Sequence, residues 1–344
     1  MKAVLYHRQG GPEVLEYTDV ADPEPGAKDV VIAVAATALN HLDIVQRNGW
    51  FTMPGFHLPH IAGMDLAGTV QSIGAEVERF AVGDRVVVDP SLIGVPAGSK
   101  LAGGGDIHGE LFIIGATVDG GYAELCLAPE SHVHHVPPSI SLDHAATFPT
   151  CYLTVWHALF EVGELEAGET VMIHAAGSGT GVAAIQLAKH RGATVIATAG
   201  TDEKCQHALA IGCDFVCNNR TTDVAAFARE ITGGRGVDMV FDHIGPALFE
   251  ASFYSLALRG RFVTCGNTTG DQFTVPSIGH LYHTGIRILG SDPYRSDEFA
   301  PAWSAFCDGR FDAIIDSEFP LAEAGAAQQK MLSSNFFGKI LLRP

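Results

Sequence analysis

The first 125 or so residues contain short runs in which apolar residues either follow one another or alternate with polar ones. These runs are KAVLYH (2–7), VVIAVAATAL (30–39), LAGTVQSIG (66–74), DRVVVDP (84–90) and YAELCLA (122–128). Gly and Pro residues cluster between the runs, which is typical of turns between β-strands. Several short strands at close spacing predict a compact, barrel-like β domain.

A different pattern begins near residue 140. Residues 142–162 have the apolar spacing of a helix, and Ser141 precedes them as a suitable N-cap. From residue 168 onward, strand and helix patterns alternate, with Gly or Asn at the junctions. This alternation predicts a parallel, doubly wound sheet. Within it we expect a helix over residues 247–260 and a strand over 261–266, and the chain ends in a strand, KILLRP (339–344).

A glycine-rich loop joins the first strand of this alternating region to its helix. The sequence VMIHAAGSGTGVAAIQLAK places Gly177, Gly179 and Gly181 between an apolar strand and a helix. Glycines permit a tight turn and a close approach of the backbone to a pyrophosphate, and the N-terminus of the helix directs its free N–H groups at that charge. The strand on one side and the helix on the other make this motif a dinucleotide site.

The end of the next strand indicates which dinucleotide binds. A site for NAD places Asp or Glu there to bind the ribose 2′-hydroxyl, but this strand ends in Ala199-Gly200 and continues with Thr201 and Lys204. A hydroxyl and a cation suit a 2′-phosphate, so we expect NADPH. Asp202 and Glu203 follow in the same turn and leave NADH open.

Composition and charge exclude several classes of protein. The chain has 344 residues, of which 47% are hydrophobic and 17% charged, so it is not a disordered chain. Its formal net charge of −18 argues against binding to nucleic acid or to anionic membranes. The longest apolar run, residues 30–39, is shorter than the roughly 18 residues of a membrane helix. The seven cysteines show no disulfide spacing and the start shows no apolar signal-peptide core, so we expect a reduced, cytoplasmic protein.

Seven segments carry a resemblance to a known family. They are ALNHLDIVQRNG (38–49), IAGMDLAGTVQSIG (61–74), FAVGDRVVV (80–88), DGGYAELCLAP (119–129), the glycine loop, GGRGVDMVFDHIG (233–245) and FGKIL (337–341). With them the chain resembles a medium-chain dehydrogenase/reductase over nearly its full length. The resemblance implies a GroES-like, β-rich catalytic domain over residues 1–148 and a Rossmann cofactor domain over residues 149–290. It also implies a return to the catalytic domain over residues 291–344, and an active site between the two domains.

The family contains zinc-dependent alcohol dehydrogenases and zinc-free quinone or enone reductases. Its three catalytic-zinc positions, normally Cys, His and Cys, match Asn40, Met64 and Thr150 here, with Cys151 one residue later. These side chains are poor zinc ligands compared with thiolate and imidazole. The lobe that carries the family's structural zinc matches residues 89–121, which hold nine glycines and no cysteine. The resemblance therefore implies that no metal is bound.

The resemblance also implies roles at the catalytic centre. Asn40 is the leading hydrogen-bond donor to an acceptor oxygen or to the nicotinamide ribose, and a turn-forming Asn is the alternative. His41 and Asp43 are further candidates, since a histidine near neutral pKa relays a proton, although His41 also suits a packed position at a helix start. Thr150 completes the catalytic set. Asp65 replaces the family's Glu beside the zinc, and we expect it to pair with a local cation instead.

The same resemblance implies the contacts to the cofactor. Lys339 lies where the family brings a cation to the pyrophosphate, and Thr154 where a helix faces the nicotinamide. The full expected set is Thr154, Gly177, Ser178, Gly179, Thr180, Gly181, Val182, Gly200, Thr201, Lys204, His243, Gly266, Asn267 and Lys339.

Three functions remain open from the sequence. Without a Lewis acid an alcohol is not readily activated, so we expect hydride transfer from NADPH to a quinone, or, as the alternative, to a conjugated enal or enone. The third function is a non-catalytic, crystallin-like NADPH-binding protein, and a zinc alcohol dehydrogenase is a distant fourth. Residues 286–291 resemble the strand by which cofactor domains of the family pair, so we expect a homodimer.

Overall fold

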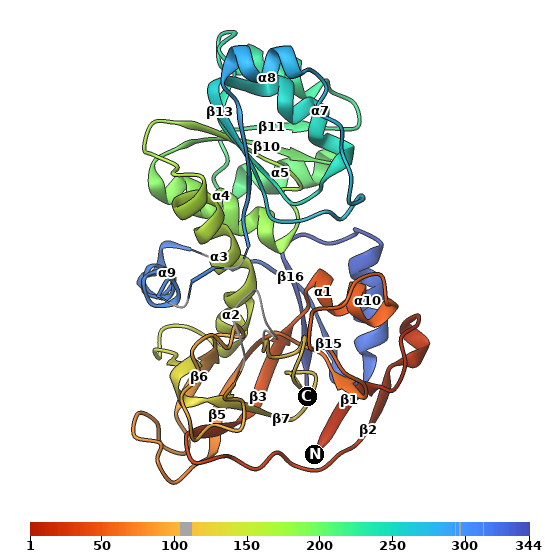
Figure 1. Cartoon of the computed structure of the whole chain (residues 1–344), viewed down its shortest axis with the longest axis vertical. Helices are drawn as coiled ribbons and strands as arrows, with labels where there is room; N and C mark the ends of the chain where they lie inside the picture. The colour runs from red at the N-terminus through yellow and green to blue at the C-terminus, as the bar shows by residue number, and fades with distance from the viewer. Residues whose placement is uncertain (104–111, 293, 296, 312) are drawn as a thin grey trace. The chain divides into compact units, whose positions relative to one another are not determined.

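The computed structural model describes residues 1–103, 112–292, 294–295, 297–311 and 313–344, and the chain divides into two compact units (Figure 1). The first unit comprises Met1–Thr150 and Asp312–Pro344, and the second comprises Cys151–Phe311. We expected the chain to leave the second domain at residue 291, but the segment up to Phe311 groups with the second unit. The reason is aromatic packing, since the rings of Phe306 and Phe311 lie 5.1 and 5.9 Å from the ring of Tyr152.

The first unit is rich in β-strands, as its apolar runs predict. Its larger sheet has the strand order β15-β16-β3-β5-β6-β8, with β7 also paired to β3, and a second sheet has the order β2-β1-β4. Its strands and helices are β1 (Lys2–Tyr6), β2 (Glu16–Asp19), β3 (Asp29–Ala38), α1 (His41–Asn48), β4 (His60–Ile61), β5 (Asp65–Ile73), β6 (Arg85–Val88), β7 (Leu125–Pro129), β8 (Val133–His135), α2 (Leu142–Thr147), β15 (Ile315–Pro320), α10 (Ala324–Leu332) and β16 (Lys339–Arg343). Short 3₁₀ turns lie at Pro12–Val14, Glu130–His132 and Leu321–Glu323.

The last strand of the chain lies beside one of the first. β16 pairs antiparallel with β3, with Leu341 opposite Ala38 and Leu342 opposite Thr37. The backbone N–H of Leu39 continues this ladder by donating to the carbonyl oxygen of Ile340 at 3.0 Å. This register brings the start of β16 next to the end of β3, so Lys339 arrives beside Asn40.

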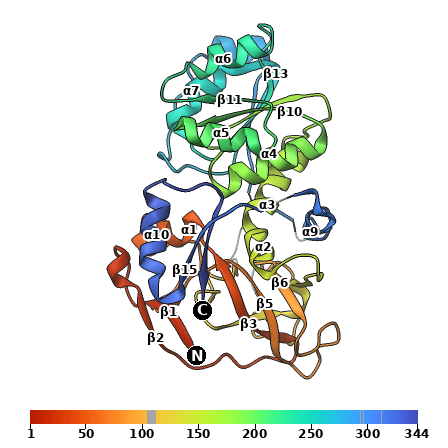
Figure 2. The ribbon, with the colours of Figure 1, turned by 180° about the vertical axis from the view of Figure 1, so that it is seen from behind.

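The second unit has the doubly wound architecture that the alternating pattern predicts. Its parallel sheet has the order β11-β10-β9-β12-β13-β14, with α4 and α5 on one face and α6, α7 and α8 on the other (Figures 1 and 2). The elements are α3 (Pro149–Trp156, which starts in the first unit), β9 (Thr170–Ile173), α4 (Gly179–Arg191), β10 (Thr194–Ala199), α5 (Asp202–Ala210), β11 (Phe215–Asn218), α6 (Val224–Ile231), β12 (Val237–Asp242), α7 (Pro246–Ser255), β13 (Leu256–Thr264), α8 (Ile278–Thr284), β14 (Arg287–Gly290) and α9 (Phe299–Ala305). Turns of π-helix follow α3 at His157–Val162 and α9 at Phe306–Arg310.

One predicted boundary is wrong. The helix expected over residues 247–260 ends at Ser255, and β13 starts at Leu256 without an intervening loop. The segment Leu256–Gly260 was assigned to the helix because no Pro or Gly stands between helix and strand to mark the change. Pairing of β13 with both β12 and β14 decides the conformation in place of local propensity.

Two other expectations concern residues 142–162 and the loop 89–121. Ser141 does cap α2, since its side chain accepts a hydrogen bond from the backbone N–H of His144, and the predicted helix is divided before Pro149 into α2 and α3. In the loop, isolated bridges join Ser91 to Ile113 and Ile114 to Val118. Residues 104–111 of that loop lie outside the described residues, so the expected metal-free lobe stays a prediction.

Candidate functional site

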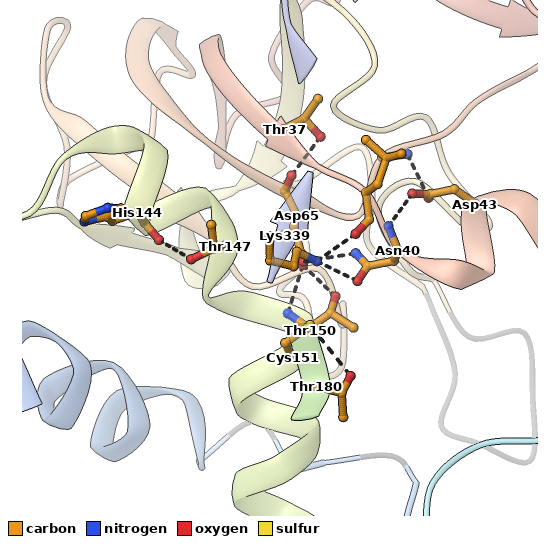
Figure 3. A network of polar contacts seen from close by, with 12 residues as sticks. Thr37, Asn40, Asp43, Asp65, His144, Thr147, Thr150, Cys151, Thr180 and Lys339 are labelled. Atoms are coloured by element: carbon orange, nitrogen blue, oxygen red, sulfur yellow. Dashed lines mark hydrogen bonds and ion pairs between the residues drawn. The ribbon is translucent and has the colours of Figure 1, made fainter. Parts of the chain in front are cut away.

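A cluster of polar side chains at the end of β3 surrounds the carboxylate of Asp65 (Figure 3). The Nζ atom of Lys339 lies 3.0 Å from Oδ2 of Asp65 and 2.9 Å from Oδ1 of Asn40, and it also donates to the backbone oxygen of Leu39 at 2.8 Å. The Nδ2 atom of Asn40 donates to Oδ2 of Asp65 at 2.9 Å. Asp65, Lys339 and Asn40 keep only 0%, 5% and 8% of their surface exposed, so this is a buried ion pair that an amide bridges.

The second oxygen of the same carboxylate binds the start of helix α3. Both the backbone N–H and the hydroxyl of Thr150 donate to Oδ1 of Asp65, at 2.8 and 2.6 Å. The charge of Asp65 is therefore balanced by the Lys339 ammonium, and both of its oxygens accept hydrogen bonds, as a buried carboxylate requires. The expectation that Asp65 pairs with a cation is confirmed, and the cation is Lys339.

Asp43 lies next to this cluster, but its carboxylate stabilises the start of helix α1. Its carboxylate accepts hydrogen bonds from the backbone N–H of Asn40 at 2.8 Å and from the hydroxyl of Tyr122 at 3.1 Å. Burial raises the pKa of Asp43 from its usual value near 4 to about 6, although these hydrogen bonds and the charge of Lys339 oppose the rise. His41, the first residue of α1, has an exposed side chain.

The family's zinc positions do not suit a metal here. Met64 packs in an apolar cluster with Ile113 and Ala116, and the Asn40 amide and Thr150 hydroxyl are engaged with Asp65. The Lys339 ammonium already supplies the positive charge at Asp65, and a second cation would be repelled. Among the described residues no group of three or more His, Cys, Asp or Glu side chains is placed to hold a metal ion.

Lys339 corrects one expectation about the cofactor. We assigned it to a pyrophosphate, but an ammonium group has three hydrogens, and three acceptors of the first unit lie within 3.0 Å of Nζ. Its hydrogen-bonding capacity is used in the Asp65 cluster. We therefore withdraw the phosphate role.

The glycine loop of the second unit has the predicted form. Helix α4 starts at Gly179, and Ser178 caps it by accepting a hydrogen bond from the N–H of Gly181 at 2.8 Å. A Cβ at Gly181 would lie 2.3 Å from the carbonyl oxygen of Ala175, so only glycine fits there. The hydroxyl of Ser178 also lies 2.8 Å from Nε2 of His243, which follows β12. Thr180 donates to the Cys151 sulfur at 3.8 Å.

The other expected cofactor residues follow the carboxyl ends of neighbouring strands. Gly200 and Thr201 follow β10, and Gly266 and Asn267 follow β13, so these strand ends share one edge of a parallel sheet with the glycine loop. In a doubly wound sheet this edge is where ligands bind. Val182 is an exception, because its side chain is buried and its N–H donates within α4 to Ser178. Nothing in the structure tests the role of Thr154 in α3, which stays a prediction.

Arg220 also lies at this edge, although the sequence did not predict it as a candidate. β10 and β11 pair with Ala199 opposite Asn218, and the N–H of Asn219 donates to the oxygen of Ala199. The pairing places the side chain of Arg220 over Gly200, where Nε would lie 3.2 Å from a Cβ added to that glycine. Arg220 is exposed and lies over the end of β10, the strand that Thr201 and Lys204 follow in the chain. The sequence feature that could have identified Arg220 is an arginine two residues after β11, the third strand of the Rossmann pattern.

Comparisons with known proteins agree with the fold of the two units. The family model described as "Alcohol dehydrogenase GroES-like domain" matches residues 26–138, and the model described as "Zinc-binding dehydrogenase" matches residues 179–308. A quinone oxidoreductase of Pseudomonas aeruginosa is 31% identical, with 100% of this chain and 99% of the relative covered. A 2-haloacrylate reductase of a Burkholderia species is 30% identical, with coverage of 99% and 98%.

Solved structures share the fold over the whole chain. A structure described as an NAD-dependent alcohol dehydrogenase has a TM-score of 0.91 and 35% identity, and both chains are covered completely. The Escherichia coli quinone oxidoreductase complexed with NADPH has a TM-score of 0.83 and 28% identity, again with complete coverage of both chains. Within the described part of this chain, no helix has the length and apolar character needed to cross a membrane.

Proposed function

Because this chain belongs to the medium-chain dehydrogenase/reductase superfamily, in its quinone oxidoreductase-like branch, we propose that it transfers a hydride from NADPH to a quinone without zinc. Its relatives make it an oxidoreductase that uses a nicotinamide cofactor. NADPH, the type of acceptor and independence of zinc are the parts that we propose.

The observation that carries the proposal is the Asp65 cluster. An ammonium ion, an amide and a hydroxyl occupy the family's metal region, and Lys339 already neutralises the carboxylate. Such a set of side chains is poorly suited to hold the Lewis acid that would generate an alkoxide from an alcohol. It does offer the second N–H of the Asn40 amide, and this donor suits an acceptor oxygen that gains negative charge as a hydride arrives. Quinones and conjugated carbonyl compounds are acceptors of this kind.

In this mechanism the nicotinamide supplies the hydride chemistry when NADPH is bound, and the chain's residues orient and stabilise. The Asn40 amide donates a hydrogen bond to the acceptor oxygen. The N-terminus of α4 would hold the pyrophosphate through its backbone N–H groups and the helix dipole, and Ser178 caps that helix while its own N–H donates to the oxygen of Ala175. Water supplies the proton that completes the reduction, because the Asp43 carboxylate is engaged in capping α1.

Arg220 and Lys204 support NADPH over NADH. Both are cations next to the end of β10, where the ribose 2′ position lies in this fold. A guanidinium is suited to a phosphate because it offers paired N–H donors in one plane. Asp202 would repel a 2′-phosphate, but its Oδ1 accepts a hydrogen bond from Asn218 at 2.8 Å, which holds that carboxylate against β11. We therefore propose NADPH.

An enal or enone reductase is the second candidate, and one observation favours it. A relative named 2-haloacrylate reductase matches nearly the whole chain, and haloacrylates carry a conjugated carbon–carbon double bond. In that reaction the hydride goes to the β-carbon, and the Asn40 amide stabilises the enolate oxygen in the same way. The non-catalytic, crystallin-like role requires no such donor.

The test is NADPH oxidation by the purified full-length protein, followed at 340 nm with a benzoquinone series and an alkenal series. We expect turnover with the quinones and a higher kcat/KM for NADPH than for NADH. Faster turnover with alkenals would favour the second candidate. Tight NADPH binding with no turnover in either series would support the non-catalytic role and contradict the proposal.

We also propose that the protein is a homodimer. β14 (Arg287–Gly290) is the last strand in the sheet order of the second unit, and an unpaired strand edge is commonly covered by a second copy. Sedimentation equilibrium checks this. A monomer at micromolar concentration would contradict it.

A further inference from the structure

We propose that Lys339 is a positioning residue that orients and polarises the Asn40 amide, so that this amide becomes the oxyanion donor of the reaction. The inference deepens the proposed function and rests on it. It follows from the contacts of Asn40, Asp65 and Lys339 within the first unit (Figure 3).

The two neighbours of Asn40 leave its amide one orientation. Lys339 has only hydrogens to offer, and the Asp65 carboxylate has only lone pairs. The amide oxygen must therefore face the Lys339 ammonium, 2.9 Å away, and the amide nitrogen must face Asp65, also 2.9 Å away. The reversed amide would place NH₂ against the ammonium and the carbonyl oxygen against the carboxylate. The ion pair therefore fixes the direction in which Asn40 presents its hydrogens.

The same geometry leaves one hydrogen for the reaction. The Asn40 nitrogen carries two hydrogens, and Oδ2 of Asp65 accepts one of them. The second points away from that bond in the plane of the amide. Asp65 keeps none of its surface exposed, whereas Asn40 keeps 8%, and the hydroxyl hydrogen of Thr150 is used by Asp65. We therefore assign the contact with a substrate oxygen to the second Asn40 hydrogen.

The charge of Lys339 also strengthens the Asn40 N–H as a hydrogen-bond donor, in addition to orienting the amide. An ammonium ion at the amide oxygen stabilises the resonance form with negative oxygen and positive nitrogen, so the N–H becomes a stronger donor. Hydrogen-bonded groups in a chain polarise one another in this way, most of all where water is excluded. Lys339 is 5% exposed, and its place is fixed by the β16–β3 register and by its backbone N–H bond to Ile314 at 2.8 Å.

The competing explanation is that Lys339 only neutralises Asp65. Two variants separate the explanations. Lys339→Met alone leaves Asp65 buried without a counter-charge and can unfold the unit. The double variant Asp65→Asn with Lys339→Met removes both charges and leaves polar side chains for Thr150 and Asn40. The matched control is Lys330→Met, which removes a lysine that pairs with Asp316 at 2.6 Å elsewhere in the same unit.

We expect the double variant to be folded and to bind NADPH with unchanged Kd, measured by fluorescence, but to lose at least about tenfold in kcat. This loss is smaller than the roughly 10²–10³-fold loss from removing an oxyanion donor outright. The loss should be largest for the quinones of lowest reduction potential, because these need the most stabilisation of oxygen. Lys330→Met should keep the wild-type kcat.

A further comparison tests whether Lys339 acts through Asn40. In the Asn40→Ala background, adding the double change should cost no more activity, because the group that Lys339 orients is absent. Two results would overturn the inference even if Asn40→Ala itself is slow. One is a wild-type kcat in the double variant. The other is that the double change lowers kcat by the same factor in the Asn40→Ala background as in the wild-type protein. A wild-type protein that reduces no quinone or alkenal would instead overturn the proposed function.

Discussion

Lys339 and Asp65 form an ion pair of 3.0 Å across 274 positions of sequence. The pair joins the start of the last strand, β16, to the start of β5, with Asn40 at the end of β3 between them. A buried pair of this kind contributes little compared with apolar packing, but removing one partner is costly. A single substitution in this cluster therefore changes both stability and catalysis. A double substitution that removes both charges separates the two effects.

The first prediction concerns stability. Lys339→Met should lower the free energy of unfolding by about 3–5 kcal/mol, because it leaves the Asp65 carboxylate buried and unpaired. The double variant with Asp65→Asn should recover most of this loss. Urea unfolding followed by circular dichroism measures both. Lys330→Met, at a more exposed pair, should cost about 1 kcal/mol or less, and an equal cost for both lysines would contradict the prediction.

The second prediction concerns turnover. Asn40→Ala should reduce kcat with quinones about 10²–10³-fold, the usual effect of losing an oxyanion donor, and should leave the Kd for NADPH nearly unchanged. Asn48→Ala changes the same residue type at the end of the same helix and serves as the control. If turnover of Asn40→Ala equals that of wild type, Asn40 has no part in the mechanism.

The third prediction concerns cofactor choice. Arg220→Gln should weaken NADPH binding about 10- to 100-fold, as expected for one charge-assisted hydrogen bond worth roughly 1.5–3 kcal/mol, and should leave NADH binding unchanged. Isothermal titration with both cofactors measures the difference. Arg235→Gln is the control, because Arg235 precedes β12 at the amino end of the same sheet and pairs with Asp238. Equal affinity of the wild-type protein for NADPH and NADH would contradict the assignment.

The fourth prediction concerns pH. The pKa of Asp43 is raised to about 6 in the folded chain, so the folded state holds a proton that the unfolded state releases near pH 4. Stability from this group is therefore present below about pH 4 and is lost as pH rises to about 6. Asp43→Asn should remove this loss, and its stability relative to wild type should rise across the window by about 3 kcal/mol. Urea unfolding at several pH values tests this, and a constant difference would contradict it.

Local patterns predicted most of the fold but not the contacts that define the site. The strand runs, the Ser141 cap and the glycine loop depend on nearby residues, so their sequence signals are strong. The predicted end of α7 was wrong because strand pairing, and not a Pro or Gly residue, ends the helix at Ser255. Pairing of Asp65 with a cation was expected, but its partner was assigned to the phosphate.

The wrong role of Lys339 and the omission of Arg220 share one cause. Lys339 reaches Asn40 only through the pairing of β16 with β3, and Arg220 reaches Gly200 only through the pairing of β10 with β11. Neither contact has a local signal, because strand order in a sheet is set by the whole chain. The segment before Phe311 also depends on contacts between residues far apart in the chain, here ring contacts to Tyr152 that place it in the second unit.

The central claim is that electrons pass from NADPH to the acceptor with an amide and an ammonium group in place of a metal. The most direct measurement is the rate of NADPH oxidation by a benzoquinone after exhaustive dialysis against a chelator, with metal content determined on the same sample. We predict an unchanged rate with far less than one zinc per chain. A rate that collapses on dialysis and returns with added Zn²⁺ would contradict the account.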